Sequence, residues 1–108
     1  MYNILLLGSG GREHSIAWAL SKDIKVNKLY CAPGNAGTFS IAINVTLDIM
    51  NNDLVYDFVK EKKINLIVVG PEQPLENGIV DYFEDKDIQI FGPSKYASQL
   101  ETSKLFAR

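Results

Sequence analysis

Two kinds of hydrophobic pattern alternate along the chain. Short runs dominated by apolar residues are typical of parallel strands covered on both faces, and they predict strands at 3–7, 28–32, 41–45, 65–70 and 88–92. Between these runs the helical spacing of apolar residues predicts helices at 13–22, 53–63, 78–86 and 95–107. Ser94 would cap the last helix. The alternation predicts an α/β fold, an open and mainly parallel sheet with helices on both faces.

Two of the predicted helices carry an apolar stripe that would face the sheet. In the helix at 13–22 the stripe consists of Ile16, Ala17, Ala19 and Leu20. In the helix at 53–63 the inward positions would be Leu54, Val55, Phe58 and Val59. Lysines at the end of this second helix suit the negative end of its dipole.

Composition narrows the function classes. The 108 residues suffice for one domain, and the net charge of −2 excludes a broad basic surface for nucleic acid or an anionic membrane. No apolar run approaches the ~20 residues of a membrane span. The lone histidine, His14, and the lone cysteine, Cys31, exclude metal sites built from Cys and His clusters. A single cysteine also fits a reducing cytoplasm.

The two ends of the sequence predict a cytoplasmic piece of a longer protein. The first strand begins after only Met1 and Tyr2, which leaves no room for a signal peptide. The last helical segment reaches Arg108 without a Gly, Asn or Pro to end it. We therefore expect a domain at 1–94, followed at 95–108 by a helix that leads toward a further region.

The carboxyl ends of the predicted strands are the expected ligand-binding edge. The segments that follow the strands read "GSGGRE", "APGNAGT", "GPEQPL" and "FGPS", and they contain most of the glycines and all four prolines. The connections at the opposite edge, "KDIKVNK", "KEKKIN" and "EDKDIQ", contain neither residue type. In open α/β sheets ligands bind beyond the carboxyl ends of the strands, so this asymmetry favours a functional edge.

The first of these loops predicts a phosphate site. Gly8, Gly10 and Gly11 would let the backbone turn tightly and leave amides free at the positive end of a helix. A dinucleotide site would need a small residue where Glu13 stands and an acid after the second strand, and the sequence has neither. We expect a sugar phosphate instead, with Glu13 turned toward a ribose hydroxyl or amine. Gly10 would be the point of closest approach, so that Gly10→Val would abolish binding without unfolding the domain.

Two other loops leave alternatives open. Glu72 follows a buried strand, where its carboxylate could accept hydrogen bonds from sugar hydroxyls or simply lie in solvent. Asn35, Gly37 and Thr38 form a polar loop at the same edge that could bind a ligand or serve only as a turn. A Walker A loop is excluded because no G-K-[ST] follows the first strand, and a receiver domain is disfavoured because that strand ends without an acidic pair.

Three further side chains have competing interpretations. Arg12 could pair with a phosphate or with a nearby acid such as Glu13 or Glu72. His14 has no triad partner in its vicinity, which favours a structural role in which it packs against Trp18. The cysteine lies inside an apolar strand and is expected to be inert core.

Four motifs together carry a resemblance to a known family. In order and at natural spacing, "GSGGREHSIAW", "APGNAGT", "VVGPEQPLENGIVDYF" and "FGPSKYASQLETSKLFAR" resemble the amino-terminal domain of the phosphoribosylamine–glycine ligases, also called glycinamide ribonucleotide synthetases. The resemblance covers the whole chain. A G-x-G-G loop alone is weak evidence, but four motifs in register are specific.

The resemblance implies both a fold and an activity. The fold would be a Rossmann-like domain that precedes an ATP-grasp region. The family joins glycine to 5-phosphoribosylamine with hydrolysis of ATP to ADP and phosphate, through an acyl phosphate of glycine, in purine biosynthesis. The partners would be these small molecules and the remainder of the chain. ATP and Mg²⁺ (or Mn²⁺) would be bound outside these residues, and this fragment would be inactive alone and contain no catalytic residue.

The resemblance also implies site residues. Residues around phosphoribosylamine would be Gly8, Gly10, Gly11, Arg12 and Glu13 in the first loop, Pro33, Gly34, Asn35, Gly37 and Thr38 in the second, and Gly70, Pro71 and Glu72 in the third. Lys104 resembles a lysine that can reach the phosphates of ATP. The alternatives are the matching domain of another ATP-grasp ligase or carboxylase, a nucleotide-binding module, and a dinucleotide-dependent oxidoreductase domain.

Overall fold

The computed structural model describes residues 2–70, 74, 77–86 and 88–92. Within these residues the chain forms a five-stranded, all-parallel sheet with the strand order β3-β2-β1-β4-β5. The strands are β1 (Tyr2–Gly8), β2 (Val26–Pro33), β3 (Ile43–Asn44), β4 (Leu66–Val69) and β5 (Gln89–Phe91). The predicted parallel α/β sheet is confirmed. The expected helix at 95–107 lies outside the described residues.

The strand order places a switch point at the centre of the sheet. From β1 the chain continues outward to β2 and β3, and then crosses to β4 and β5 on the other side of β1. Residues of β1 therefore have parallel neighbours on both sides: Leu6 pairs with Cys31 of β2 and with Val68 of β4. In open α/β sheets the crevice beyond such a switch point is the usual place for a ligand.

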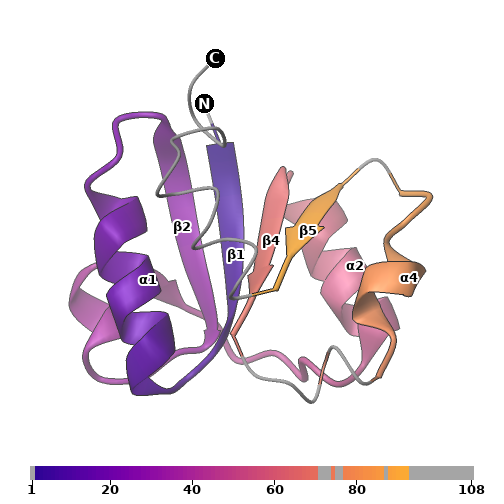
Figure 1. Ribbon diagram of the computed structural model, residues 1–108, viewed down its shortest axis with the longest axis horizontal. Helices are drawn as coiled ribbons and strands as arrows, with labels where there is room; N and C mark the ends of the chain where they lie inside the picture. Colours follow the sequence, from indigo (N-terminus) through magenta and orange to yellow (C-terminus); the bar gives the residue numbers. More distant parts are fainter. Residues whose placement is uncertain (1, 71–73, 75–76, 87, 93–108) are drawn as a thin grey trace.

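Helices cover both faces of the sheet, as predicted (Figure 1). The helical elements are α1 (Gly11–Ser21), η1 (Thr38–Ser40), α2 (Asn52–Glu61) and α4 (Ile79–Tyr82). On one face Ile4 and Leu6 of β1 belong to the same buried cluster as Leu20 of α1. On the other face Leu5 packs in a cluster with Val55 of α2 and with Phe83, which follows α4. These side chains are fully or almost fully buried, which explains why the first strand is continuously apolar from Ile4 to Leu7.

The element boundaries differ from the predicted ones in ways that matter later. Helix α1 begins at Gly11 rather than at Glu13, and β3 is shorter than predicted. Leu54, expected to point inward, is 43% exposed, because the buried stripe of α2 consists of residues spaced by three and four, Val55, Phe58 and Val59. None of the helices in the described part of the chain is long and apolar enough to cross a membrane.

Helices α2 and α4 are linked by a polar contact on their outer side. The hydroxyl of Tyr82 donates to Oδ1 of Asp53 at 2.5 Å, and the ammonium of Lys86 lies 4.4 Å from the centre of the Tyr82 ring. The hydrogen bond to Asp53 raises the pKa of Tyr82 from its ordinary 10.0 to about 12. The bond exists only while the phenol keeps its proton, so it links folding to pH.

We expect Tyr82→Phe to flatten the pH dependence of stability in alkaline solution. A tyrosine whose pKa is raised by folding contributes stability that is complete below pH 10.0 and is lost as the pH rises through about 12. Urea unfolding across that interval measures the change. Asp53→Asn should also lower the midpoint of tyrosinate absorbance, and an unchanged midpoint would contradict the role given to this carboxylate.

Candidate functional site

The loop between β1 and α1 is closed by the side chain of Glu13. Gly10 is the N-cap of α1, which makes Glu13 the third residue of the helix, where a glutamate can reach back to the amides before it. Its Oε1 accepts hydrogen bonds from the backbone N–H of Ser9 at 3.2 Å and of Gly10 at 3.1 Å. The expectation that these loop amides are free for a phosphate is therefore wrong: a carboxylate of the chain itself occupies them.

Two glycines at the ends of neighbouring strands make room for this carboxylate. A Cβ at Gly8, the last residue of β1, would lie 2.2 Å from Oε1 of Glu13. A Cβ at Gly70, directly after β4, would lie 2.4 Å from Cδ of Glu13. Glu13 is only 6% exposed as a result. Because β1 and β4 are adjacent at the switch point, this arrangement places the carboxylate in the centre of the predicted ligand-binding edge. We call these three residues the Glu13 seat.

The other two loop glycines have space around them. A Cβ at Gly10 would lie 3.5 Å from Oε1 of Glu13, an ordinary van der Waals contact, and a Cβ at Gly11 would meet no atom within 4 Å. The approach of a ligand to Gly10 stays a prediction, whereas the tightest contacts with Glu13 occur at Gly8 and Gly70. In these two cases the group that approaches is a side chain of the protein.

The second loop is tied to the first by Asn35. Its amide Nδ2 donates to the carbonyl of Ser9 at 2.7 Å, and the neighbouring backbone N–H of Gly34 donates to the carbonyl of Gly8 at 3.0 Å. Oδ1 of Asn35 accepts a hydrogen bond from the backbone N–H of Thr38 at 2.9 Å. The structure thus brings the two predicted loops together and gives the Asn35 amide a role in fixing their relative position.

Thr38 and Asn44 complete this network beneath the second loop. The Thr38 hydroxyl accepts from the N–H of Asn35 at 2.8 Å and lies 2.8 Å from Oδ1 of Asn44, to which it donates. Asn44 in turn donates through Nδ2 to the Asn35 carbonyl at 2.8 Å. Sequence reasoning missed Asn44. The available signal was a polar residue within the apolar run at 41–45, because a polar side chain in a covered strand needs hydrogen-bond partners.

We expect Thr38→Val to destabilise the domain by about 1–3 kcal/mol, because it leaves buried partners of the hydroxyl unsatisfied. Thr38 has an exposed fraction of 0%, so water cannot replace the lost bonds without rearrangement. Urea unfolding measures the loss. Thr38→Ser, which keeps the hydroxyl, is the matched control and should recover most of it. If the valine and serine variants are equally stable, the hydroxyl does not hold the loop.

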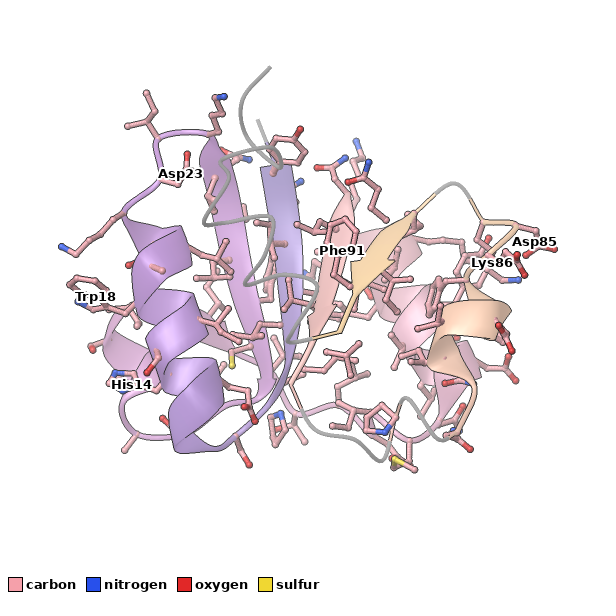
Figure 2. The ribbon with its side chains drawn as sticks, viewed as in Figure 1. His14, Trp18, Asp23, Asp85, Lys86 and Phe91 are labelled. Atoms are coloured by element: carbon pink, nitrogen blue, oxygen red, sulfur yellow. The ribbon has the colours of Figure 1, made fainter. Side chains whose placement is uncertain are left out.

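His14 lies close to the second loop, and Cys31 lies in the core. His14 lies on the outer side of α1 together with Trp18 (Figure 2), and a Cβ at Gly37 would come within 3.1 Å of the His14 ring, so the second loop passes close to it. The thiol of Cys31 is fully buried and lies 3.7 Å from the Gly8 carbonyl. Burial raises the pKa of this thiol, against a smaller lowering by a hydrogen bond with Thr38. It stays protonated near neutral pH, as expected for core.

A cavity of about 420 Å³ opens beside the first loop, at the carboxyl end of the sheet. In Figure 1 the carboxyl ends of β1, β2 and β4 converge along the lower edge of the molecule, where the segment that leads into α2 also runs. The apolar wall of the cavity consists of Pro33, Leu47, Ile49, Met50 and Pro74. Its polar lining comes from the first loop, Glu13 and Asp48. We call this cavity the Glu13 pocket.

Several predicted site residues cannot be placed. Pro71, Glu72 and Lys104 lie outside the described residues, and for Arg12 the backbone belongs to α1 but the side chain is not described. In the described part of the chain no three Asp, Glu, His or Cys side chains are grouped so that they could hold a metal ion.

The comparisons with known proteins decide the family. The family model described as "Phosphoribosylglycinamide synthetase, N domain" matches residues 2–101. The chain belongs to this family. Among the relatives of this N domain, the phosphoribosylamine–glycine ligase of Rhodopirellula baltica is 50% identical over 107 residues, which is 99% of this chain and 24% of that protein. The ligase of Mesorhizobium japonicum is 52% identical over 106 residues, 98% of this chain and 25% of that protein.

A solved structure supports the same assignment of the N domain. The crystal structure of the phosphoribosylamine–glycine ligase from Thermotoga maritima matches with a TM-score of 0.51 and 31% identity, over 66% of this chain and 16% of that one. This N domain spans about a quarter of the length of the curated relatives that it matches. The resemblance drawn from the four motifs is therefore confirmed.

Proposed function

We propose that this chain is the amino-terminal, substrate-binding domain of a phosphoribosylamine–glycine ligase. The complete enzyme joins glycine to 5-phosphoribosylamine, hydrolyses ATP to ADP and phosphate, and produces glycinamide ribonucleotide for purine biosynthesis in the cytoplasm. The match of the family model to residues 2–101 is the observation that carries this proposal. Relatives with this name that are about half identical over almost the whole chain give it further support.

The Glu13 pocket is the proposed place of phosphoribosylamine. It lies at the switch point of the sheet, and loops from the ends of β1 and β2 line it. The residues that we assign to the surroundings of the ligand are those of the three motif loops, including Arg12, Pro71 and Glu72. We assign Glu72 to the ribose hydroxyls, because a carboxylate accepts two hydrogen bonds from neighbouring hydroxyl groups.

ATP and Mg²⁺ (or Mn²⁺) belong to the proposed remainder of the enzyme. We assign none of the described residues to the nucleotide or to the metal, and no three Asp, Glu, His or Cys side chains among them are grouped so that they could hold a metal ion. Lys104 is the one residue of this chain to which we assign a contact with ATP phosphate. ATP would supply the phosphoryl group that activates the glycine carboxylate.

Enzyme assays test the proposal directly. The complete purified protein is expected to form glycinamide ribonucleotide and ADP from phosphoribosylamine, glycine and ATP, and to restore growth without purines to a strain that lacks this ligase. The chain of residues 1–108 alone is expected to form no product. Failure of the complete protein to form product, or turnover by the short chain, would refute the respective part of the proposal.

A further inference from the structure

The charged groups that the described residues bring to the Glu13 pocket are of one sign. Glu13 and Asp48 are the charged residues among the described ones that line it, and the facing wall is apolar. One oxygen of Asp48 accepts a hydrogen bond from the backbone N–H of Met50 at 3.1 Å, which fixes the carboxylate beside the pocket. A phosphate that entered this space would meet the buried carboxylate of Glu13 and the exposed carboxylate of Asp48, and both would repel it.

Glu13 also offers a hydrogen-bond acceptor to the pocket. Oε1 is engaged by the amides of Ser9 and Gly10, whereas Oε2 has no hydrogen-bond partner among the described residues. The side chain is 6% exposed and lines the pocket. A carboxylate oxygen that lines a pocket can accept a hydrogen bond from a ligand donor, either a hydroxyl or an ammonium group.

The Glu13 seat indicates that this carboxylate is a fixed part of the site. Gly8 and Gly70 leave a space that any other residue's Cβ would fill, and Glu13 fills it. The side chain also replaces a ligand anion at the loop amides, as a capping glutamate does at a helix start. A ligand phosphate at Ser9 and Gly10 would have to expel it into solvent.

From these observations we infer that the Glu13 pocket takes the hydroxyl- and amine-bearing end of its ligand and excludes the phosphate. This inference rests on the proposed function. For 5-phosphoribosylamine it places a ribose hydroxyl or the amine at Oε2 of Glu13, with the phosphate outside the pocket. It therefore reverses the usual orientation at a glycine-rich loop, in which the phosphate lies on the loop amides.

The first experiment reads the loop amides directly and needs no turnover. The complete protein, labelled with ¹⁵N-glycine, is titrated with inorganic phosphate while the Gly10 amide signal is followed. The wild-type signal is expected to stay in place. In Glu13→Ala, which empties the two amides, phosphate should shift it. Glu84→Gln, an exposed carboxylate outside the pocket lining, is the control and should behave as wild type. A shift in the wild-type protein at the same phosphate concentrations as in Glu13→Ala would overturn the inference.

The second experiment tests whether the carboxylate of Glu13 binds phosphoribosylamine through Oε2. Glu13→Gln keeps the size of the side chain and an oxygen for the loop amides but removes the charge. We expect the KM for phosphoribosylamine to rise about 10- to 100-fold, as for a lost hydrogen bond to a charged group, with the KM values for ATP and glycine unchanged. An unchanged KM for phosphoribosylamine in a folded variant would also overturn the inference. If the wild-type protein makes no product, the proposed function fails, and the phosphate titration still decides the charge preference of the pocket.

Discussion

Replacing Gly8 with alanine is expected to destabilise the domain by about 3–5 kcal/mol, because two separate penalties combine. The new Cβ would lie 2.2 Å from Oε1 of Glu13, so the glutamate must leave its seat and lose both amide hydrogen bonds. The backbone of Gly8 also has a φ of +135°, which side chains with a Cβ rarely adopt. Since domains are stable by only about 5–15 kcal/mol, this single methyl group would remove a large part of the total.

Urea unfolding of wild type and variant measures this loss, and the same loop provides a control. Gly11→Ala places a Cβ in open space within the first turn of α1, so its stability should stay equal or rise by less than about 1 kcal/mol. Two Gly→Ala changes in the same loop should thus differ by several kcal/mol in their effect on stability. If both variants unfold at the wild-type urea concentration, Glu13 does not occupy the space beside Gly8.

The sheet could be predicted from the sequence because burial on both faces leaves a local signal. Ile4 and Leu6 face α1 while Leu5 and Leu7 face α2 and α4, so no position from Ile4 to Leu7 is polar. The helix boundaries and buried faces were harder to predict from the sequence. The stripe of α2 was predicted one residue too wide, since Leu54 is apolar yet lies at the edge of the buried face. Apolar residues at such edges are common on protein surfaces and give no separate signal.

The edge of the sheet at which the candidate pocket lies was predictable, and the contacts of Glu13 within it were not. Glycines at the strand ends indicated the ligand-binding edge, and the structure places the Glu13 pocket there. The role of Glu13 depends on a helix that begins two residues earlier than its apolar pattern does, which turns a first-turn acid into a cap. It also depends on Gly70, which is 57 positions away and reaches Glu13 only through the pairing of β1 with β4. Contacts of this kind follow from strand order, which a single sequence does not specify locally.

The polar residues of the second loop could not be assigned a role from the sequence, because their hydrogen-bond partners lie elsewhere in the chain. Asn35 and Thr38 were expected to contact the ligand or to form a turn, and they fix the loop by hydrogen bonds to each other and to the first loop. Their partner Asn44 comes from β3, which pairs with β2 at the edge of the sheet. Polar side chains that organise a loop and polar side chains that bind a ligand look alike in a sequence. Their partners distinguish them.

Gly70→Ala is expected to cost about 1.5–3 kcal/mol in the wild-type background, the value of hydrogen bonds to a charged group. Its Cβ would lie 2.4 Å from Cδ of Glu13, so the glutamate is displaced, but Gly70 is not among the glycines with positive φ. The whole penalty of this substitution should therefore pass through Glu13. A double-mutant cycle with Glu13→Ala isolates that interaction, because the glutamate side chain beyond Cβ is then absent.

In the Glu13→Ala background Gly70→Ala should be nearly neutral, within about 0.5 kcal/mol. Gly8→Ala in the same background should still cost about 1–3 kcal/mol, because its backbone strain does not depend on the glutamate. Urea unfolding of the single and double variants gives both values. A Gly70→Ala penalty that is equally large with and without the Glu13 side chain would mean that the alanine meets something other than this carboxylate. The two strand-end glycines would then have separate functions, and Glu13 would be only the cap of its own helix.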